Sequence, residues 1–247
     1  MRSRLDVEMT RRGLSESRES AQRLIMAGRV RVNSRPAAKP DLRVDSTAEI
    51  VLVGAQSEYA SRGGYKLAAA LDHFVICVDG RHALDVGAST GGFTDVLLKR
   101  GAAHVIALDV GYGQLAERLR TDPRVTVLDR TNVRYIEVKD LPYRPDLVVI
   151  DTSFISLRLV LPAILRVVAA AADVIALVKP QFEVGKGKVG KGGIVRDEAL
   201  RREALEGVLK FASGIGLKII GVIESPIKGA SGNQEFLAMF HYSSHAG

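Results

Sequence analysis

The length, charge and cysteine content of this chain exclude several classes of protein. Its 247 residues suffice for one core of usual size and a small additional module. The single cysteine, Cys77, excludes an internal disulfide, and the net charge of +7 favours a polyanionic partner. Residues 1–8 lack the apolar core of a signal peptide, so we expect a cytoplasmic protein.

The first 45 residues are rich in arginine and predict a small α+β module. Between Arg2 and Asp45 there are eleven Arg or Lys residues and six Asp or Glu residues. Apolar spacing predicts two short helices over residues 4–12 and 17–27, followed by a strand-turn-strand over residues 30–36. The second helix has one basic and one apolar face. By itself, such a basic face more often marks a solvated surface than a binding site.

From about residue 80 onward, strand-like runs alternate with helical stretches. We expect strands at 83–86, 105–109, 125–128, 147–150, 174–178, 219–223 and 236–242, and the clearest helices at 93–100, 114–120, 159–170 and 197–213. This alternation predicts an α/β fold with a parallel sheet covered on both faces. No helix separates the last two strands, so the final strand is expected to run antiparallel. That is the order of the class I, Rossmann-like methyltransferase fold, with a seven-stranded, mostly parallel sheet.

One apolar segment, residues 159–178, could be mistaken for a membrane span. Arg166 and Asp173 would then lie inside the bilayer, where each would cost about 2.5–3.5 kcal/mol near the centre. A helix followed by a buried strand explains the segment better. No membrane partner is therefore expected.

The first strand after residue 80 ends in a glycine-rich turn, which is the best candidate for a ligand site. Gly87, Gly91 and Gly92 let the backbone turn sharply and approach a ligand closely. Their spacing differs from the dinucleotide fingerprint, and Phe93 stands where a P-loop needs lysine. A turn without a cation, preceded by Asp85, suits a ligand with positive charge and hydroxyls. S-adenosylmethionine is such a ligand.

Polar residues at the ends of the next two strands extend the predicted cofactor site. Asp109 closes the second strand, where an acid can accept hydrogen bonds from ribose hydroxyls. Asp129 and Asn132 follow the third strand and are candidates for the adenine edge, although a turn asparagine more often caps local backbone. The predicted cofactor-binding residues are Asp85, Gly87, Ala88, Ser89, Thr90, Gly91, Gly92, Phe93, Asp109, Asp129 and Asn132. Nothing in the sequence requires a metal.

Two lysines and two acids lie at or near the positions where the predicted strands should form a crevice. Asp151 follows the fourth strand and Lys179 the fifth, while Lys66 lies on a helix ahead of the first strand and Glu235 opens the last. Singly, each would more often form a surface ion pair worth about 0–1 kcal/mol. Together they can converge on one site. A lysine partly removed from water, beside a second cation, can lose its proton and act as a general base.

Several segments together resemble the TlyA family. They are residues 59–67, 85–95, 151–156, 179–183 and 192–197, and residues 4–45 resemble the small RNA-binding domain first defined in ribosomal protein S-four. That family joins an S-four-type domain, here residues 1–60, to an FtsJ-like methyltransferase domain, here residues 61–247. It methylates ribose 2′-hydroxyls of ribosomal RNA. Members also carry the name haemolysin.

The resemblance implies roles for particular residues and a particular partner. Lys66, Asp151, Lys179 and Glu235 match the Lys-Asp-Lys-Glu tetrad of FtsJ-like ribose methyltransferases, with Lys179 as the base. The expected substrate is ribosomal RNA within ribosomal subunits, with a cytidine ribose as acceptor. A membrane-active haemolysin and a catalytically inactive ribosome-binding or assembly factor remain the alternatives.

The expected RNA contacts lie in two basic segments. The glycine-lysine loop over residues 185–193 comes close to a P-loop, but Gly192 stands where Ser or Thr should bind magnesium. We expect a mobile basic loop that closes over RNA, and without the resemblance a plain surface loop is an equal alternative. The predicted RNA-binding residues are Arg4, Arg18, Arg23, Arg29, Arg31, Lys186, Lys188 and Lys191.

Overall fold

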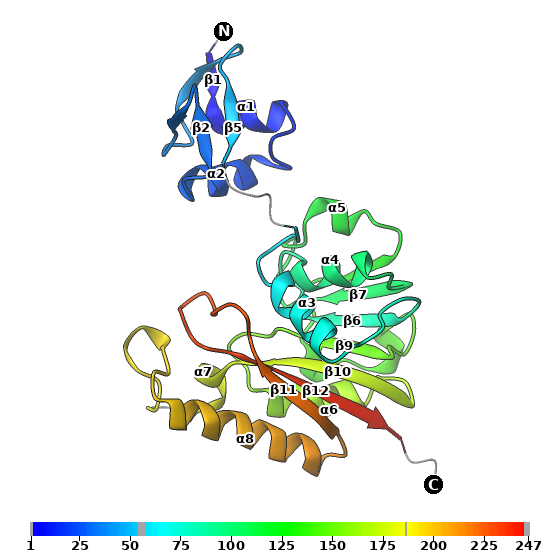
Figure 1. The fold of residues 1–247 in the computed structure, drawn as a ribbon. Coiled ribbons are helices and arrows are strands. Elements are labelled where there is room, and N and C mark those ends of the chain that lie inside the picture. The colour runs from blue at the N-terminus through cyan, green and yellow to red at the C-terminus, as the bar shows by residue number, and fades with distance from the viewer. Residues whose placement is uncertain (1, 54–57, 186, 245–247) are drawn as a thin grey trace. The chain divides into compact units, whose positions relative to one another are not determined.

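The computed structural model describes residues 2–53, 58–185 and 187–244. The chain divides into two compact units, residues 1–58 and 59–247 (Figure 1). Each unit has a hydrophobic core of its own. The arginine-rich module of the sequence lies in the first unit, and the alternating strands and helices lie in the second.

In the first unit, two short helices pack with two small antiparallel sheets. The elements are α1 (Leu5–Arg11), α2 (Arg18–Met26), the pair β1 (Arg2–Arg4) and β4 (Arg43–Asp45), and the three strands β3 (Arg35–Pro36), β2 (Val30–Val32) and β5 (Ile50–Leu52). Leu5, Met9, Ile25 and Val30 are fully buried between them. Ser17 caps α2, because its Oγ accepts a hydrogen bond from the amide of Ser20.

A seven-stranded sheet forms the centre of the second unit. Its strand order is β11-β12-β10-β9-β6-β7-β8. The strands are β6 (His82–Val86), β7 (His104–Leu108), β8 (Val125–Leu128), β9 (Leu147–Ile150), β10 (Ala171–Val178), β11 (Lys218–Glu224) and β12 (Phe236–Ser243). Only β12 runs antiparallel to both of its neighbours. The expected class I methyltransferase fold, with a mostly parallel sheet, is therefore confirmed.

Helices cover both faces of this sheet, as Figure 1 shows. The helices α3 (Gly64–His73), α4 (Gly92–Lys99) and α5 (Glu117–Arg120) pack on one face, and α6 (Leu157–Leu165) and α8 (Glu198–Gly214) pack on the other. Short helical turns lie in two of the connections along the chain. They are η1 (Val133–Tyr135) and η2 (Val138–Asp140) between β8 and β9, and α7 (Pro180–Glu183) and η3 (Lys191–Gly193) between β10 and α8. Successive residues of β6 face opposite cores, Ala83 towards α3 and α4 and Leu84 towards α6 and α8.

Two predicted helices are shorter in the structure. The helix expected over residues 159–170 ends at Leu165, because the chain must turn before β10 begins at Ala171. The helix expected over residues 114–120 begins only at Glu117, because the preceding residues form a turn whose Gly113 amide binds Asp129. Within the described ranges, none of the helices is both long enough and apolar enough to cross a membrane.

Candidate active site

A pocket of about 470 Å³ lies at the carboxyl ends of the central strands. The chain runs outward from β6 to β7 and β8, then returns to β9 on the other side of β6. Such a reversal in strand order leaves a crevice between neighbouring strand ends, where α/β sheets bind ligands. All four residues predicted to be catalytic line this pocket, together with six of the predicted cofactor residues, Gly87, Ala88, Ser89, Thr90, Gly92 and Phe93.

The four charged residues form two close ion pairs in the pocket wall. Lys66 Nζ lies 2.6 Å from Glu235 Oε2, and Lys179 Nζ lies 2.6 Å from Asp151 Oδ1. The lysines are only 7% and 8% exposed. A charge so far from water is stable only with a close partner, so the two acids hold the two amines in place.

Additional contacts orient both pairs. Lys179 Nζ donates a second hydrogen bond to Ser153 Oγ at 2.9 Å, and the ring of Phe182 lies 6.0 Å from the same nitrogen. Glu235 fits against Gly229, where a Cβ atom would lie only 2.3 Å from Glu235 Oε1. A side chain at position 229 would therefore displace the carboxylate that binds Lys66.

The glycine turn after β6 approaches the residue that follows β9. Gly87 has φ of +85°, and a Cβ atom there would lie 2.6 Å from the backbone oxygen of Asp151. A Cβ atom on Gly92 would lie 2.2 Å from Ser61 Oγ. Only glycine satisfies both the left-handed backbone and the close approach at position 87. The turn thus presents bare backbone to the pocket.

Asp85 is buried beneath this turn and does not line the pocket. It is fully buried, and its Oδ2 accepts a 2.6 Å hydrogen bond from Thr94 Oγ1. Its Oδ1 has no hydrogen-bond partner among the described residues. Burial, with smaller contributions from the charges of Asp151 and Asp109, raises the pKa of Asp85 to about 7.

This raised pKa predicts a pH-dependent stability difference between the protein and its Asp85→Asn variant. Because the folded pKa lies above the ordinary value of 3.8, the folded state keeps a proton that the unfolded state loses. Relative to the variant, the protein should lose up to about 1.4 kcal/mol of stability per pH unit between these two pKa values. Urea unfolding of both proteins at about pH 5 and about pH 8 measures this. Parallel pH profiles would show that Asp85 stays ionised in the folded state.

The remaining predicted cofactor residues shape loops around the pocket. Asp109 accepts hydrogen bonds from the amides of Ser89 at 2.8 Å and Gly111 at 2.7 Å, which joins the glycine turn to the loop after β7. Asp129 pairs with Arg120 at 2.9 Å. Asn132 caps η1 by accepting a hydrogen bond from the amide of Arg134, the local role typical of a turn asparagine.

These three residues and Gly91 are not among the residues that line the pocket. A Cβ atom on Gly91 would meet the side chains of Leu119 and Leu115. The position therefore faces the packing of α5. Contact of Asp109, Asp129 or Asn132 with a cofactor stays a prediction.

Sequence reasoning missed several residues of the pocket. Phe154 is 91% exposed, has φ of +64°, and lies with its ring centroid 5.1 Å from that of Phe182. Gln181 also lines the pocket, and its Oε1 is buried without a hydrogen-bond partner among the described residues. An exposed aromatic ring on a strained backbone and an unsatisfied acceptor both suit contact with a ligand. In the sequence, the only signal for a role of Phe154 in the pocket is its position three residues after Asp151, at the end of a strand.

In the first unit, one buried acid gathers two of the predicted RNA-binding arginines. Asp6 is fully buried and accepts hydrogen bonds from Arg4 Nε at 3.0 Å, Arg18 Nε at 2.9 Å and Gln22 Nε2 at 2.8 Å. The hydrogen bond from Arg4, together with those from Gln22 and Arg18, holds the pKa of Asp6 well below its usual range despite its burial. The side chains of Arg4 and Arg18 remain 35% and 54% exposed, so both are fixed at the surface.

Replacing Asp6 should loosen this arrangement. We expect Asp6→Asn to destabilise the first unit by about 1.5–3 kcal/mol, the range for hydrogen bonds to a charged group. Hydrogen exchange of the α1 and α2 amides in the full chain measures the change. Asp45→Asn is the matched control, because Asp45 pairs with Arg2 where both side chains are more than half exposed. That control should cost about 0–1 kcal/mol. Equal protection in both variants would contradict the prediction.

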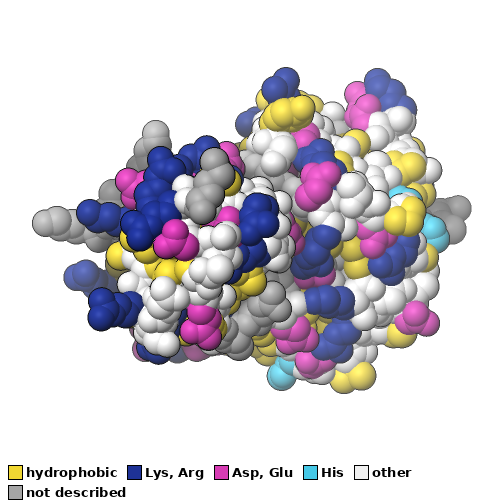
Figure 2. Space-filling view, turned by 90° about the horizontal axis from the view of Figure 1, so that it is seen from above, with side chains coloured by type: hydrophobic (Ala, Val, Ile, Leu, Met, Phe, Trp, Pro, Cys, Tyr) yellow, Lys and Arg dark blue, Asp and Glu magenta, His cyan; other side chains and the backbone are white. Residues whose placement is uncertain are grey.

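The other predicted RNA contacts differ in their surroundings. Arg23 and Arg31 are exposed, and Arg29 is half-buried. Lys188 Nζ lies 2.8 Å from Glu203 Oε1 of α8. Lys186 and the side chain of Lys191 lie outside the described residues. Figure 2 shows exposed Lys and Arg side chains in groups, with acidic side chains among them. Their contact with RNA stays a prediction.

Comparison with known proteins identifies the family. Residues 59–242 match the FtsJ-like methyltransferase family, and residues 3–50 match the S4 domain. The chain is 53% identical to the 16S/23S rRNA (cytidine-2'-O)-methyltransferase TlyA of Mycobacterium tuberculosis, over 95% of this chain and 88% of the relative. This chain belongs to the TlyA family of FtsJ-like methyltransferases. The family expected from the sequence is therefore confirmed.

Other relatives in this family carry a different name. Hemolysin A of Brachyspira hyodysenteriae is 42% identical over 96% of this chain and 99% of that relative. A solved structure from Streptococcus thermophilus, provisionally named a hemolysin, is 44% identical with a TM-score of 0.77, and the match covers 98% of this chain and 89% of that one. The TlyA family thus includes proteins named for RNA methylation and proteins named for haemolysis.

Proposed function

We propose that this chain transfers the methyl group of S-adenosylmethionine to the ribose 2′-hydroxyl of a cytidine in ribosomal RNA. The observation that carries the proposal is the meeting of both lysine-acid pairs and the glycine turn in one pocket. Membership of the FtsJ-like family supports it. The name of the 53% identical relative favours this activity over haemolysis, and the complete tetrad favours an enzyme over an inactive assembly factor.

The residues around the glycine turn fit the proposed cofactor. The turn offers bare backbone at Gly87, where a Cβ atom would collide with the backbone of Asp151. It carries no lysine that would repel a sulfonium cation. Residues 87–90, Gly92 and Phe93 would hold the cofactor, with Asp109 beside them through its bond to Ser89. When bound, S-adenosylmethionine supplies a methyl group already activated by its positive charge.

Catalysis by the protein must therefore act on the ribose hydroxyl, which is a poor nucleophile while protonated. Lys179 is the proposed base. In its neutral form the amine has two N–H groups, and Asp151 and Ser153 accept hydrogen bonds at two positions around Nζ. The lone pair then occupies the remaining tetrahedral position and can accept the hydroxyl proton.

Lys66 has a different part in the proposed site. Its described partner is the 2%-exposed carboxylate of Glu235, so this pair adds a fixed cation to the pocket that contains Lys179. The ammonium of Lys66 can stabilise the negative charge that develops on the ribose oxygen. This stabilisation favours removal of the hydroxyl proton. In-line placement of the hydroxyl would provide much of the remaining rate.

The test is transfer of tritium from labelled cofactor to isolated 30S and 50S particles, followed by mapping of the labelled nucleotide. We expect label on a cytidine ribose in at least one particle. A synthetic substrate with 2′-deoxycytidine at the mapped position should accept no label. Label on a base, or none in either particle, would overturn the proposed function.

A further inference from the structure

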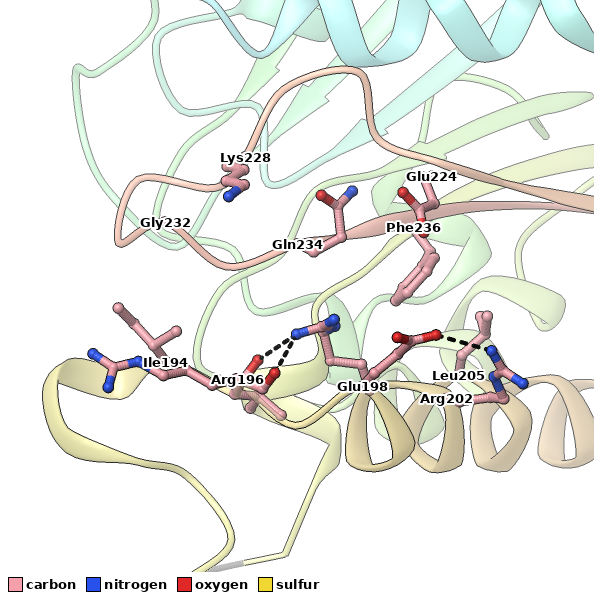
Figure 3. A pocket seen from close by; sticks show the side chains of 12 residues that line it. Ile194, Arg196, Glu198, Arg202, Leu205, Glu224, Lys228, Gly232, Gln234 and Phe236 are labelled. Carbon is pink, nitrogen blue, oxygen red and sulfur yellow. Dashed lines mark hydrogen bonds and ion pairs between the residues drawn. The ribbon is translucent and has the colours of Figure 1, made fainter.

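A second pocket, of about 580 Å³, lies beside α8, on the side of the sheet that α6 and α8 cover. It opens between the segment 224–236 and the chain that enters α8, as Figure 3 shows. Phe236 points from β12 across the gap towards the start of α8. Ile194 and Leu205 add apolar surface on the other side. The pocket therefore has apolar walls suited to the face of a flat ring.

Cations surround these apolar walls. Four cationic and two acidic side chains line the pocket, and one of the acids, Glu198, already pairs with Arg202 at 3.1 Å. Lys228 is exposed, and no ion pair or hydrogen bond of its ammonium is found within the described part of the chain. This excess of positive charge excludes a sulfonium ligand and favours an anion.

Arg201 is held in a position to bind such an anion. Its Nη1 donates to the backbone oxygens of Val195 at 3.2 Å and Arg196 at 2.7 Å, which fixes one side of the guanidinium. No hydrogen bond of Nε or Nη2 is found among the described residues. A guanidinium fixed in this way loses little freedom when its remaining donors bind a phosphate.

The two pockets share one segment of chain. Alternate residues at the start of β12 face opposite sides of the sheet, so Glu235 lines the catalytic pocket while Gln234 and Phe236 line the second one. Asn233 is 1% exposed and fixes this segment, since it binds the amide of Val195 at 2.9 Å and the carbonyl of Gly193 at 2.8 Å. The loop at residues 229–232 also contributes to both pockets, with Ala230 and Ser231 in the catalytic one and Gly232 in the second.

We propose that the second pocket takes a nucleotide of the substrate RNA next to the methylated one. Its base contacts Phe236 and Leu205, and its phosphate binds Arg201 and Lys228. The RNA strand then crosses the 229–232 loop, and residues 187–193 lead directly into the pocket at Ile194. The inference rests on the proposed function, and it adds a second binding position to the same RNA substrate.

Charge removal at the pocket tests the phosphate contact. Lys228→Ala should weaken binding to 30S or 50S particles several-fold and reduce the salt dependence by about 0.7–0.9 in the slope of log affinity against log salt. Phe236→Leu, which keeps apolar bulk, should weaken binding about tenfold through lost stacking. Lys210→Ala is the control, because Lys210 is exposed on α8 outside the pocket. Binding of S-adenosylmethionine, measured by calorimetry, should be the same in all variants.

Photo-crosslinking tests the position of the nucleotide. A benzoylphenylalanine in place of Lys228 should crosslink to a nucleotide adjacent to the methylated cytidine. A crosslink to a distant nucleotide, or Lys228→Ala binding with the salt slope of Lys210→Ala, would overturn the inference even if methyl transfer is normal. Particle binding with the predicted change in salt slope but without methyl transfer would instead support the pocket and overturn the proposed function.

Discussion

Replacement of Lys179 by methionine should slow methyl transfer by about a hundredfold to ten-thousandfold, the usual contribution of a general base. Methionine has a similar length and can keep the contact with Phe182, but it has no nitrogen to accept the hydroxyl proton. The rate should be measured in a single turnover with saturating cofactor, so that weaker binding does not appear as slower chemistry. Cofactor affinity, measured by calorimetry, should change by no more than several-fold.

The structure supplies a matched control for this experiment. Lys210→Met makes the same chemical change at an exposed position of α8, outside both pockets, and should leave the single-turnover rate unchanged. Lys179→Met also leaves Asp151 without its described ion-pair partner, so Asp151→Asn should be tested beside it. A folded Lys179→Met variant with normal transfer would show that another group takes the proton.

Gly87→Ala should abolish methyl transfer and destabilise the second unit. An alanine at φ of +85° costs about 1–2 kcal/mol in backbone strain alone. Its Cβ atom would also lie 2.6 Å from the backbone oxygen of Asp151, so the glycine turn or the end of β9 must move. Because Asp151 holds Lys179, that movement reaches the proposed base. Urea unfolding and single-turnover transfer measure the two effects.

Gly80→Ala separates the strain from the clash. Gly80 has φ of +71°, but a Cβ atom there would meet nothing within 4 Å. This variant should lose about 1–2 kcal/mol of stability and keep its activity. Equal losses of activity in the two variants would indicate that general destabilisation, and not the approach to Asp151, explains the effect at position 87.

The sequence predicted the sheet and the ends of its strands well, for a physical reason. Buried parallel strands are continuous apolar runs, and the residue after each run must lie at the carboxyl edge of the sheet. Asp151 and Lys179 stand at such positions, and the structure pairs them. The pairing of Lys66 with Glu235, which are 169 residues apart, could only be predicted through the family resemblance. No local pattern specifies a partner at that distance.

The end of α6, the exposure of Phe154 and the short strands of the first unit could not be predicted from residue type and spacing. Val167 and Val168 are buried but not helical, so the apolar pattern of α6 continued past its true end at Leu165. Phe154 is apolar by type, yet it is almost fully exposed. The short strands β1, β4 and β5 have three residues each, too few for an alternating pattern to be recognised.

The ion pair between Lys66 and Glu235 has a consequence for the order in which the site is assembled during synthesis. Lys66 is made early in the second unit, whereas its carboxylate partner comes only just before the last strand of the sheet. A nascent chain that has not reached residue 235 can pair the strands from β6 to β9, but its Lys66 lacks the carboxylate that binds the ammonium in the complete unit. The pocket is therefore completed last, and a growing chain gains its full catalytic tetrad only when the unit is nearly whole.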